Sequence, residues 1–186
     1  MTPKACATVT DAPRFHAAQP ETLLRLELWA DDKPVNRRFA KAFGAALPGP
    51  GTAVTTGSLR VIWREPGAWM IRAPLAEREA LHARLVVIAG DAGTVMDISG
   101  AAVRCALRGR DWRVLLTYGG VFDAEVPAFQ PDCVAGTLVE HIAVRYDVIA
   151  DDHVDALWHP AMPKICSAIG PRSPEVSTST GPKPVR

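Results

Sequence analysis

The chain has 186 residues, of which 48% are hydrophobic and 22% are charged, a balance typical of one soluble domain or of two small subdomains that share a core. A formal net charge of +1 gives no electrostatic reason to expect nucleic acid or an anionic membrane as a partner. No apolar run approaches the roughly 18 residues of a membrane span, and the N-terminus lacks the order of a secretory signal. We therefore expect a cytoplasmic protein with reduced cysteines, of which Cys105 lies in the core.

The first half of the chain has clear helix and strand signals. Residues 1–20 show no periodicity and predict a loose arm. A strand follows over 23–29, with alternate leucines on one face. Asp31 is typical of a helix cap and Pro34 of a first helical turn, and the apolar stripe predicts a buried helix face that continues to Leu47.

A β-hairpin is the next predicted element, over residues 59–73. Pro66 and Gly67 favour a tight turn that brings Trp63 and Trp69 onto the same face, whereas arginines occupy the opposite face. A helix over 75–88 and a strand over 95–98 complete the order βαββαβ. This order predicts a ferredoxin-like split-βαβ subdomain over 21–99.

A second, similar pass along the chain predicts another subdomain over 100–170. It has a strand that ends at Gly109 and a one-sided helix that starts at Trp112. An exposed loop over 124–135, further strand material and a short closing helix over 161–169 follow. The proline-rich tail 171–186 is expected to be disordered. The predicted fold is therefore α+β, with two ferredoxin-like subdomains between a loose arm and a disordered tail.

Motifs for catalysis or cofactor binding are absent from the sequence. Gly49-x-Gly51 follows a predicted helix instead of a strand, so it does not indicate a dinucleotide site. No nucleotide triphosphate loop occurs, and the five histidines make no metal-ligand pattern. His153 beside Asp151 and Asp152 is best explained as part of an acidic surface turn.

Asp97 and the tryptophans have two interpretations each. Asp97 lies in an apolar strand, where its carboxylate either accepts hydrogen bonds from the Ser99-Gly100 turn or anchors a ligand in a pocket. The five tryptophans are expected to fill the core, but one or two are expected to be buried only by a partner.

Several short motifs occur together and in a characteristic order. They are Trp63-x-x-Pro66-Gly67-x-Trp69, Asp97-x-Ser99-Gly100, Leu107-x-Gly109 with Val114-Leu115, and Asp123 followed by Phe129 and Gly136. Over about 59–169 the chain resembles the gamma subunit of heterotetrameric sarcosine oxidase, which is related to the folate-binding domain of aminomethyltransferases. It departs from the family pattern at Ala68, where an acidic residue is usual, and at His159-Pro160, in place of an Arg-Ser pair.

This resemblance implies the aminomethyltransferase fold and a place in a complex that oxidatively demethylates sarcosine, or a related N-methyl amino acid, to glycine and a one-carbon unit. It implies large alpha and beta subunits and a small delta subunit as partners. FAD, FMN, NAD, zinc and tetrahydrofolate would be bound elsewhere in the complex, with no catalytic, cofactor or metal residue on this chain. Two alternatives stay open: a stand-alone folate-binding one-carbon transferase in which Asp97 helps to hold the pterin, and a generic ferredoxin-like binding module.

Overall fold

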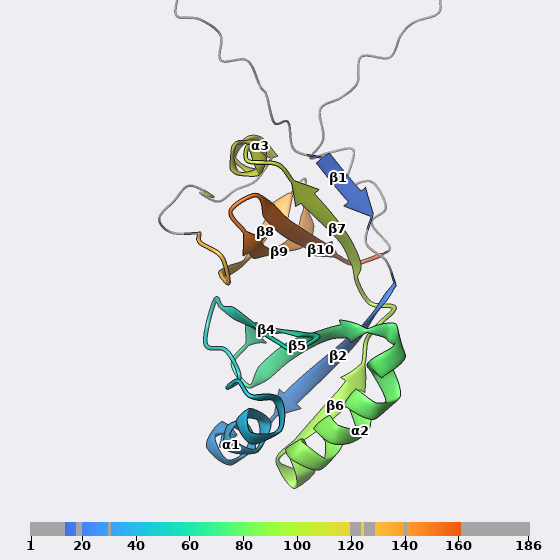
Figure 1. The fold of residues 1–186 in the computed structure, drawn as a ribbon. Helices are drawn as coiled ribbons and strands as arrows, with labels where there is room; N and C mark the ends of the chain where they lie inside the picture. The colour runs from blue at the N-terminus through green and yellow to red at the C-terminus, as the bar shows by residue number, and fades with distance from the viewer. Residues whose placement is uncertain are drawn as a thin grey trace, which may run out of the picture.

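The computed structural model describes residues 14–17, 20–29, 31–119, 124, 129–139 and 141–160. In this part of the chain two antiparallel five-stranded sheets face one another, and helices cover their outer faces (Figure 1). The helices are α1 Asp32–Phe43, α2 Arg78–Ala89 and α3 Trp112–Gly119, with short 3-10 turns at η1 Leu75–Glu77 and η2 Gly90–Ala92. The strands are β1 Arg14–Ala17, β2 Glu21–Leu28, β3 Ala53–Thr56, β4 Leu59–Glu65, β5 Ala68–Pro74, β6 Gly93–Asp97, β7 Val103–Arg108, β8 Val134–Val139, β9 Ile142–Ala150 and β10 His153–Trp158.

The first sheet has the strand order β3-β4-β5-β2-β6. Without its edge strand β3, this is the order of a ferredoxin-like split-βαβ unit, as the sequence predicts. Helices α1 and α2 cover its outer face (Figure 1). Val35 and Phe39 of α1 and Leu85 of α2 are buried there against alternate residues of the strands, including Leu24 and Ile71. The apolar stripes of the two helices and one face of the sheet thus form a single core.

Helix α1 begins where the sequence predicts but ends earlier. The Asp31 carboxylate caps its start, because Oδ1 accepts a hydrogen bond from the Lys33 backbone N–H at 3.1 Å. Gly44 adopts a left-handed conformation, with φ of 81°, and its N–H donates to the Ala40 carbonyl. The continuation to Leu47 was therefore wrong: Leu47 is buried from the following loop, which the Asn36 side chain fixes by accepting from the Leu47 N–H at 2.9 Å.

The predicted hairpin is confirmed as β4 and β5. Trp63 and Trp69 are direct cross-strand partners, and Trp69 belongs to the core under α1 and α2. Gly67 in the turn has φ of 75°, and a Cβ there would lie 2.7 Å from the Leu28 carbonyl oxygen. That position therefore requires glycine both for its conformation and for the close approach of β2.

The second sheet has the strand order β1-β7-β10-β9-β8, and α3 covers its outer face (Figure 1). Trp112 and Leu116 of α3 pack there on Cys105, which is a buried core residue as expected. The α+β class is confirmed. This sheet varies the ferredoxin-like order, because β9 and β10 are joined by a tight turn and β10 lies between β7 and β9.

Two segments of this half differ from the sequence analysis. Residues 14–17, expected in the loose arm, instead form β1, which pairs with β7. The loop predicted to be exposed over 124–135 contains the buried residues Ala124 and Phe129. The Phe129 ring meets that of Trp112 edge-on, with centroids 6.1 Å apart, so the loop helps to close the core. Asp123, the predicted closing helix 161–169 and the tail 171–186 lie outside the described residues.

The two sheets meet through side chains and along one edge. An apolar cluster from both sheets fills the middle of the interface, with Leu23, Ile62 and Met70 on one side and Val134 and Leu157 on the other. A backbone bridge between Thr52 and Cys133 connects the sheets at the edge formed by β3 and β8. Across the described residues, no helix is long and apolar enough to cross a membrane.

Candidate functional site

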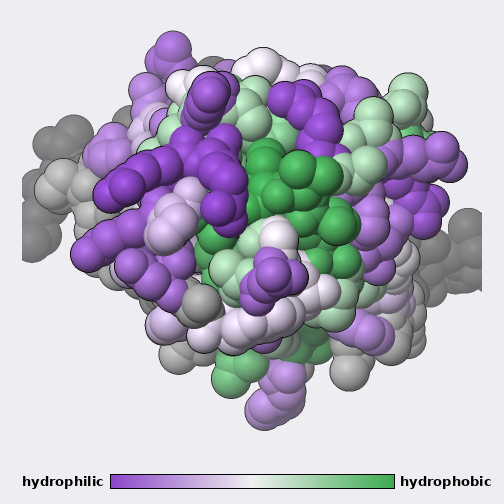
Figure 2. Space-filling view, turned by 90° about the horizontal axis from the view of Figure 1, so that it is seen from below, coloured by the Kyte–Doolittle hydropathy of each residue, from purple (hydrophilic) through white to green (hydrophobic). Residues whose placement is uncertain are grey.

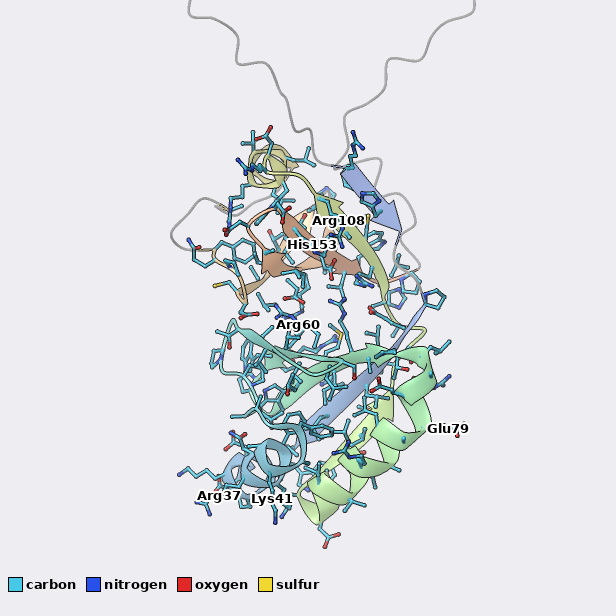
Figure 3. All side chains as sticks on the ribbon, in the orientation of Figure 1. Arg37, Lys41, Arg60, Glu79, Arg108 and His153 are labelled. Carbon is cyan, nitrogen blue, oxygen red and sulfur yellow. The ribbon has the colours of Figure 1, made fainter. Side chains whose placement is uncertain are left out.

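The space between the two sheets changes in character along the strands. Along β4, Arg60 is followed on the same face by Ile62 and then by Arg64. Arg60 belongs to a buried network of charges, Ile62 to the apolar cluster, and Arg64 to an open cleft. Figure 3 shows Arg60 between the sheets. The interface therefore has a charged, buried end and an open end.

Asp147 of β9 is the carboxylate through which the two sheets are joined electrostatically. Its side chain is fully buried and accepts from both Arg60 and Arg72. Arg60 binds it with two parallel bonds, Nε to Oδ2 at 3.1 Å and Nη2 to Oδ1 at 2.5 Å. Burial lowers the pKa of Arg60, but the bonds to Asp147 and Asp132 outweigh this and raise it above its usual value. Arg60 is therefore a permanently charged link between β4 and β9.

Asp155 of β10 is the second buried carboxylate of the network. Arg72 Nη2 lies 2.9 Å from its Oδ2, and Arg104 Nη1 lies 3.2 Å away. His153 Nε2 lies 3.0 Å from Oδ1, and Glu21 of β2 bridges Arg72 and Arg104 from the first sheet. Burial alone would raise the pKa of Asp155, but the hydrogen bond with His153 and the two arginine charges lower it to about 2.

The low pKa of Asp155 predicts a loss of stability in acid. Folding favours the ionised form, because the folded-state pKa of about 2 lies below the usual aspartate pKa of 3.8. Its contribution of about 2 kcal/mol is complete above about pH 5 and disappears as the pH falls toward 2. Urea unfolding of the parent and of Asp155→Asn between about pH 6 and pH 2 would measure this. The difference between them is expected to shrink in acid; a constant difference would contradict the prediction.

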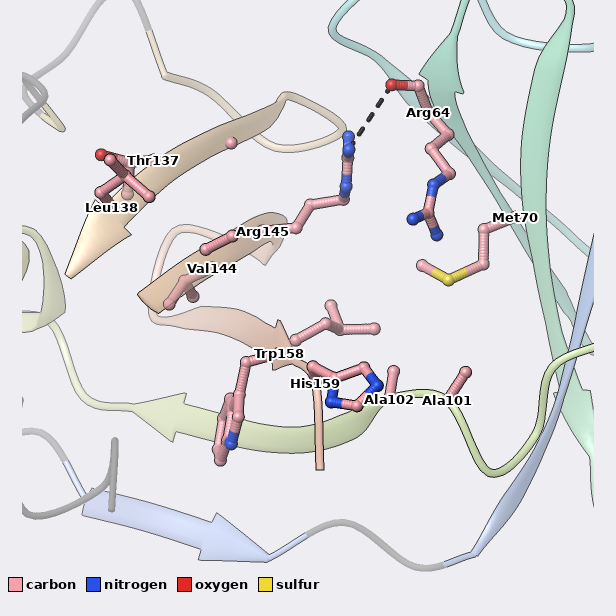
Figure 4. Close-up of a pocket in the computed structure, with 13 residues that line it drawn as sticks. Arg64, Met70, Ala101, Ala102, Thr137, Leu138, Val144, Arg145, Trp158 and His159 are labelled. Atoms are coloured by element: carbon pink, nitrogen blue, oxygen red, sulfur yellow. Dashed lines mark hydrogen bonds between the residues drawn. The ribbon is translucent and has the colours of Figure 1, made fainter. Parts of the chain in front are cut away.

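At the other end of the interface the sheets enclose a cleft of about 480 Å³. Arg64 of β4 and Met70 of β5 line one wall, and Gly136, Arg145 and Leu157 line the other. Figure 4 shows Arg64 and Arg145 reaching into it from opposite sheets, with His159 at the lower side of the view. A Cβ at Gly136 would meet no atom within 4 Å, so the space in front of this residue is open.

Asp97 has the structural role and lies away from this cleft. Its Oδ1 accepts from the Ser99 N–H at 2.9 Å and from the Ser99 hydroxyl at 2.7 Å, and its other oxygen pairs with Arg78. The bonds from Ser99 and the charge of Arg78 lower the pKa of Asp97. The hydroxyl oxygen of Ser99 also accepts from the Leu23 N–H at 3.1 Å, so the turn secures the start of β2.

The remaining motif residues lie in turns and in the core. Pro66 and Gly67 form the β4–β5 turn, and Gly100 follows Ser99 in the turn after β6. Gly109 has φ of 125° and donates its N–H to the Asp152 carbonyl at 2.9 Å, which holds the end of β7 against the β9–β10 turn. Of the motif residues in the described ranges, Gly136 alone lines the cleft.

The residues that join the sheets were not predicted from the sequence. The hairpin arginines lie on the face opposite Trp63, as predicted, but their pairing with Asp147 and Asp155 was not predicted. His153, expected in a surface turn, faces inward to Asp155. Within the described ranges no three His, Cys, Asp or Glu side chains form a group that could hold a metal ion.

Comparison with known proteins shows which solved structures have a similar fold. No family model and no curated protein matches the sequence. Among solved structures, a chain of heterotetrameric sarcosine oxidase from Corynebacterium sp. U-96, in complex with pyrrole 2-carboxylate, is similar with a TM-score of 0.72 at 20% identity; the match covers 84% of this chain and 80% of that one. The glycine cleavage system aminomethyltransferase T from Bartonella henselae is similar with a TM-score of 0.62 at 14% identity, over 87% of this chain and 46% of that one.

This chain has the fold of both proteins. The likeness found in the sequence motifs is thereby confirmed as a likeness of fold, which at these identities says nothing of activity. The chain spans less than half the length of the aminomethyltransferase, whereas it spans most of the sarcosine oxidase chain that it matches.

Proposed function

We propose that this protein is a non-catalytic subunit of a sarcosine oxidase-type complex, in which it binds larger flavin-bearing subunits. The observation that carries the proposal is the match over 84% of this chain and 80% of a chain from a heterotetrameric enzyme. Most of this chain thus has a counterpart in most of one chain of that enzyme, which a shared ferredoxin-like motif alone would not give.

The complex would oxidatively demethylate sarcosine, or a related N-methyl amino acid, to glycine and a one-carbon unit for tetrahydrofolate. The partner subunits would bind FAD, FMN, NAD and zinc. The complex would be located in the cytoplasm. A stand-alone transferase is less well supported, because this chain covers only 46% of the aminomethyltransferase that it resembles.

The outer face of α2 is the docking surface that we propose. The segment Leu85–Ala89 is apolar all round the helix: Leu85 and Ile88 face the core, whereas Val86 and Val87 face outward. Val87 is 77% exposed, and Trp29, 66% exposed, lies at the same corner, where its Nε1 donates to the Asp91 carbonyl. Figure 2 shows an apolar patch surrounded by hydrophilic side chains on the side that carries α1 and α2. A helix that is apolar on all sides is typical of a buried position.

Charged side chains beside this patch indicate the chemistry of the partner. Lys33, Arg37, Arg38 and Lys41 of α1 are exposed, and Figure 3 shows Arg37 and Lys41 at this end of the molecule. Asp31 and Asp91 are exposed beside Val87 as well, so the surface of the flavin-bearing subunit that binds here would have an apolar centre surrounded by charges of both signs.

The test is co-purification of the tagged chain from its native cells, with flavin absorbance measured on the bound fraction. The parent is expected to retain flavin-bearing subunits. Val87→Asp is expected to lower their recovery at least about tenfold, because it places a charge in an apolar interface at little cost to an exposed helix position.

Val114→Asp is the matched control, since Val114 is 47% exposed on α3, on the opposite side of the molecule. This variant should bind like the parent. Equal recovery with all three proteins would refute the α2 docking face, and a parent that retains no flavin-bearing subunit would refute the proposed function.

A further inference from the structure

The arginines at the two ends of the sheet interface differ in how their charges are balanced. In the buried network each arginine meets at least one carboxylate: Arg60 pairs with Asp147, Arg72 with Asp147 and Asp155, and Arg104 with Asp155. The cleft contains two further arginines, Arg64 and Arg145, and neither forms an ion pair with any described residue.

Arg145 is held in an unfavourable position. Among the described residues, its guanidinium donates only to the backbone carbonyls of Trp63 and Arg64, over long distances of 3.4 and 3.5 Å. Burial and the nearby charge of Arg64 both lower its pKa, and Glu65 opposes them only in part. Glu65 is already paired with Arg25, whose Nη2 lies 2.7 Å from its carboxylate. Two partly buried positive charges therefore face one cleft without a carboxylate of their own.

The rest of the cleft defines what kind of anion would fit. Met70, Leu138, Ala143, Val144 and Leu157 give it apolar walls. Its volume of about 480 Å³ lies within the range of about 300–1,000 Å³ that is usual for small-molecule sites. The guanidinium groups are planar donors whose fork matches a carboxylate. An anion with a small apolar body fits both features.

We propose that this cleft binds a small organic carboxylate, which Arg64 and Arg145 hold from opposite sheets while its apolar body packs on Met70 and Leu157. The bound carboxylate would supply the negative charge that the cleft lacks and would link β4 to β9, as Asp147 does at the other end. This inference does not depend on the proposed subunit role.

NMR titration of the full chain tests the proposal with benzoate, with benzamide as the neutral analogue of the same shape, and with inorganic phosphate. Benzoate is expected to shift the resonances of cleft residues. Its affinity should exceed that of benzamide at least about tenfold, since the amide lacks the charge that pairs with arginine. Phosphate should bind more weakly than benzoate because it has no apolar body.

Arg64→Gln and Arg145→Gln are each expected to weaken benzoate binding at least about tenfold. Arg108→Gln is the control, because Arg108 is exposed at the far end of β7. Without added ligand, the Arg145→Gln variant should have a melting temperature equal to or above that of the parent, because the substitution removes a charge that has no carboxylate partner. A lower melting temperature would indicate that Arg145 is structural, and the proposal would fail.

Two other results would also overturn it. Equal binding of benzoate and benzamide would show that the arginines do not recognise a carboxylate. Failure of benzoate to bind, together with loss of flavin-bearing subunits from both glutamine variants, would assign the arginines to a partner's side chain instead. The docking test with Val87→Asp is separate from these measurements, so the two proposals can fail independently.

Discussion

Replacing Asp147 by alanine is expected to lower the free energy of unfolding by about 3–5 kcal/mol, because it removes one member of a buried ionic network. The Asp147 side chain is fully buried and pairs with Arg60 and Arg72. Without it, the exposed Asp132 is the one carboxylate partner that Arg60 keeps in the described part of the chain, and the Arg60 guanidinium stays buried. Urea unfolding at neutral pH measures the change.

Asp132→Asn is the matched control for this prediction, because Asp132 has φ of 67° and asparagine tolerates this left-handed conformation better than alanine does. Asp132 also pairs with Arg60, but its side chain is 61% exposed. Solvent screens such a pair, so the expected cost is below about 1 kcal/mol. If the Asp147→Ala and Asp132→Asn variants were equally stable, the buried network would not hold the sheets together.

Trp69→Ala is expected to cost about 3–5 kcal/mol, the range for removing a large aromatic side chain from a core. Trp69 is 4% exposed in the cluster beneath α1 and α2. Its Nε1 also donates to the Pro48 carbonyl at 2.9 Å, so the substitution releases the loop after α1 as well. Thermal and urea unfolding of the isolated chain measure the loss.

Trp29→Ala serves as the comparison, since Trp29 is 66% exposed. Its effect on unfolding should stay within about 1 kcal/mol, whereas recovery of flavin-bearing subunits should fall. A Trp69 variant that melts like the parent would contradict the assignment of Trp69 to the core of a self-sufficient domain.

Local patterns were sufficient to predict most of the first sheet and its helices. The alternation around Pro66-Gly67 predicted the hairpin, and Asp31 predicted the start of α1, because both signals depend only on neighbouring residues. The end of α1 was predicted wrongly, because the apolar pattern of the helix continues into the loop that follows it. The apolar stripe continues to Leu47, but Gly44 ends the helix and Leu47 is buried from a loop.

Features that depend on distant residues were not predictable in this way. Arg60 and Asp147 are 87 residues apart, and nothing near either residue specifies the other. Charged residues within strands did indicate that a second layer could cover this face. An arginine on the strand face opposite the core must contact either solvent or a second layer that carries carboxylates. Strand β1 gave still less signal, because it joins β7 through backbone hydrogen bonds that almost any sequence could make.

The position of β1 has a consequence for how the protein can be made. Its partner β7 begins at Val103, 86 positions after Ala17 (103 − 17), and follows all the strands of the first sheet. The first sheet can therefore form during synthesis, whereas β1 stays unpaired until the ribosome has released β7. The second sheet is then completed last. An expression clone that starts at Glu21 would leave β7 as a bare sheet edge, open to pairing with another molecule. Fragments for crystallography or for assembly studies should therefore retain residues 14–17.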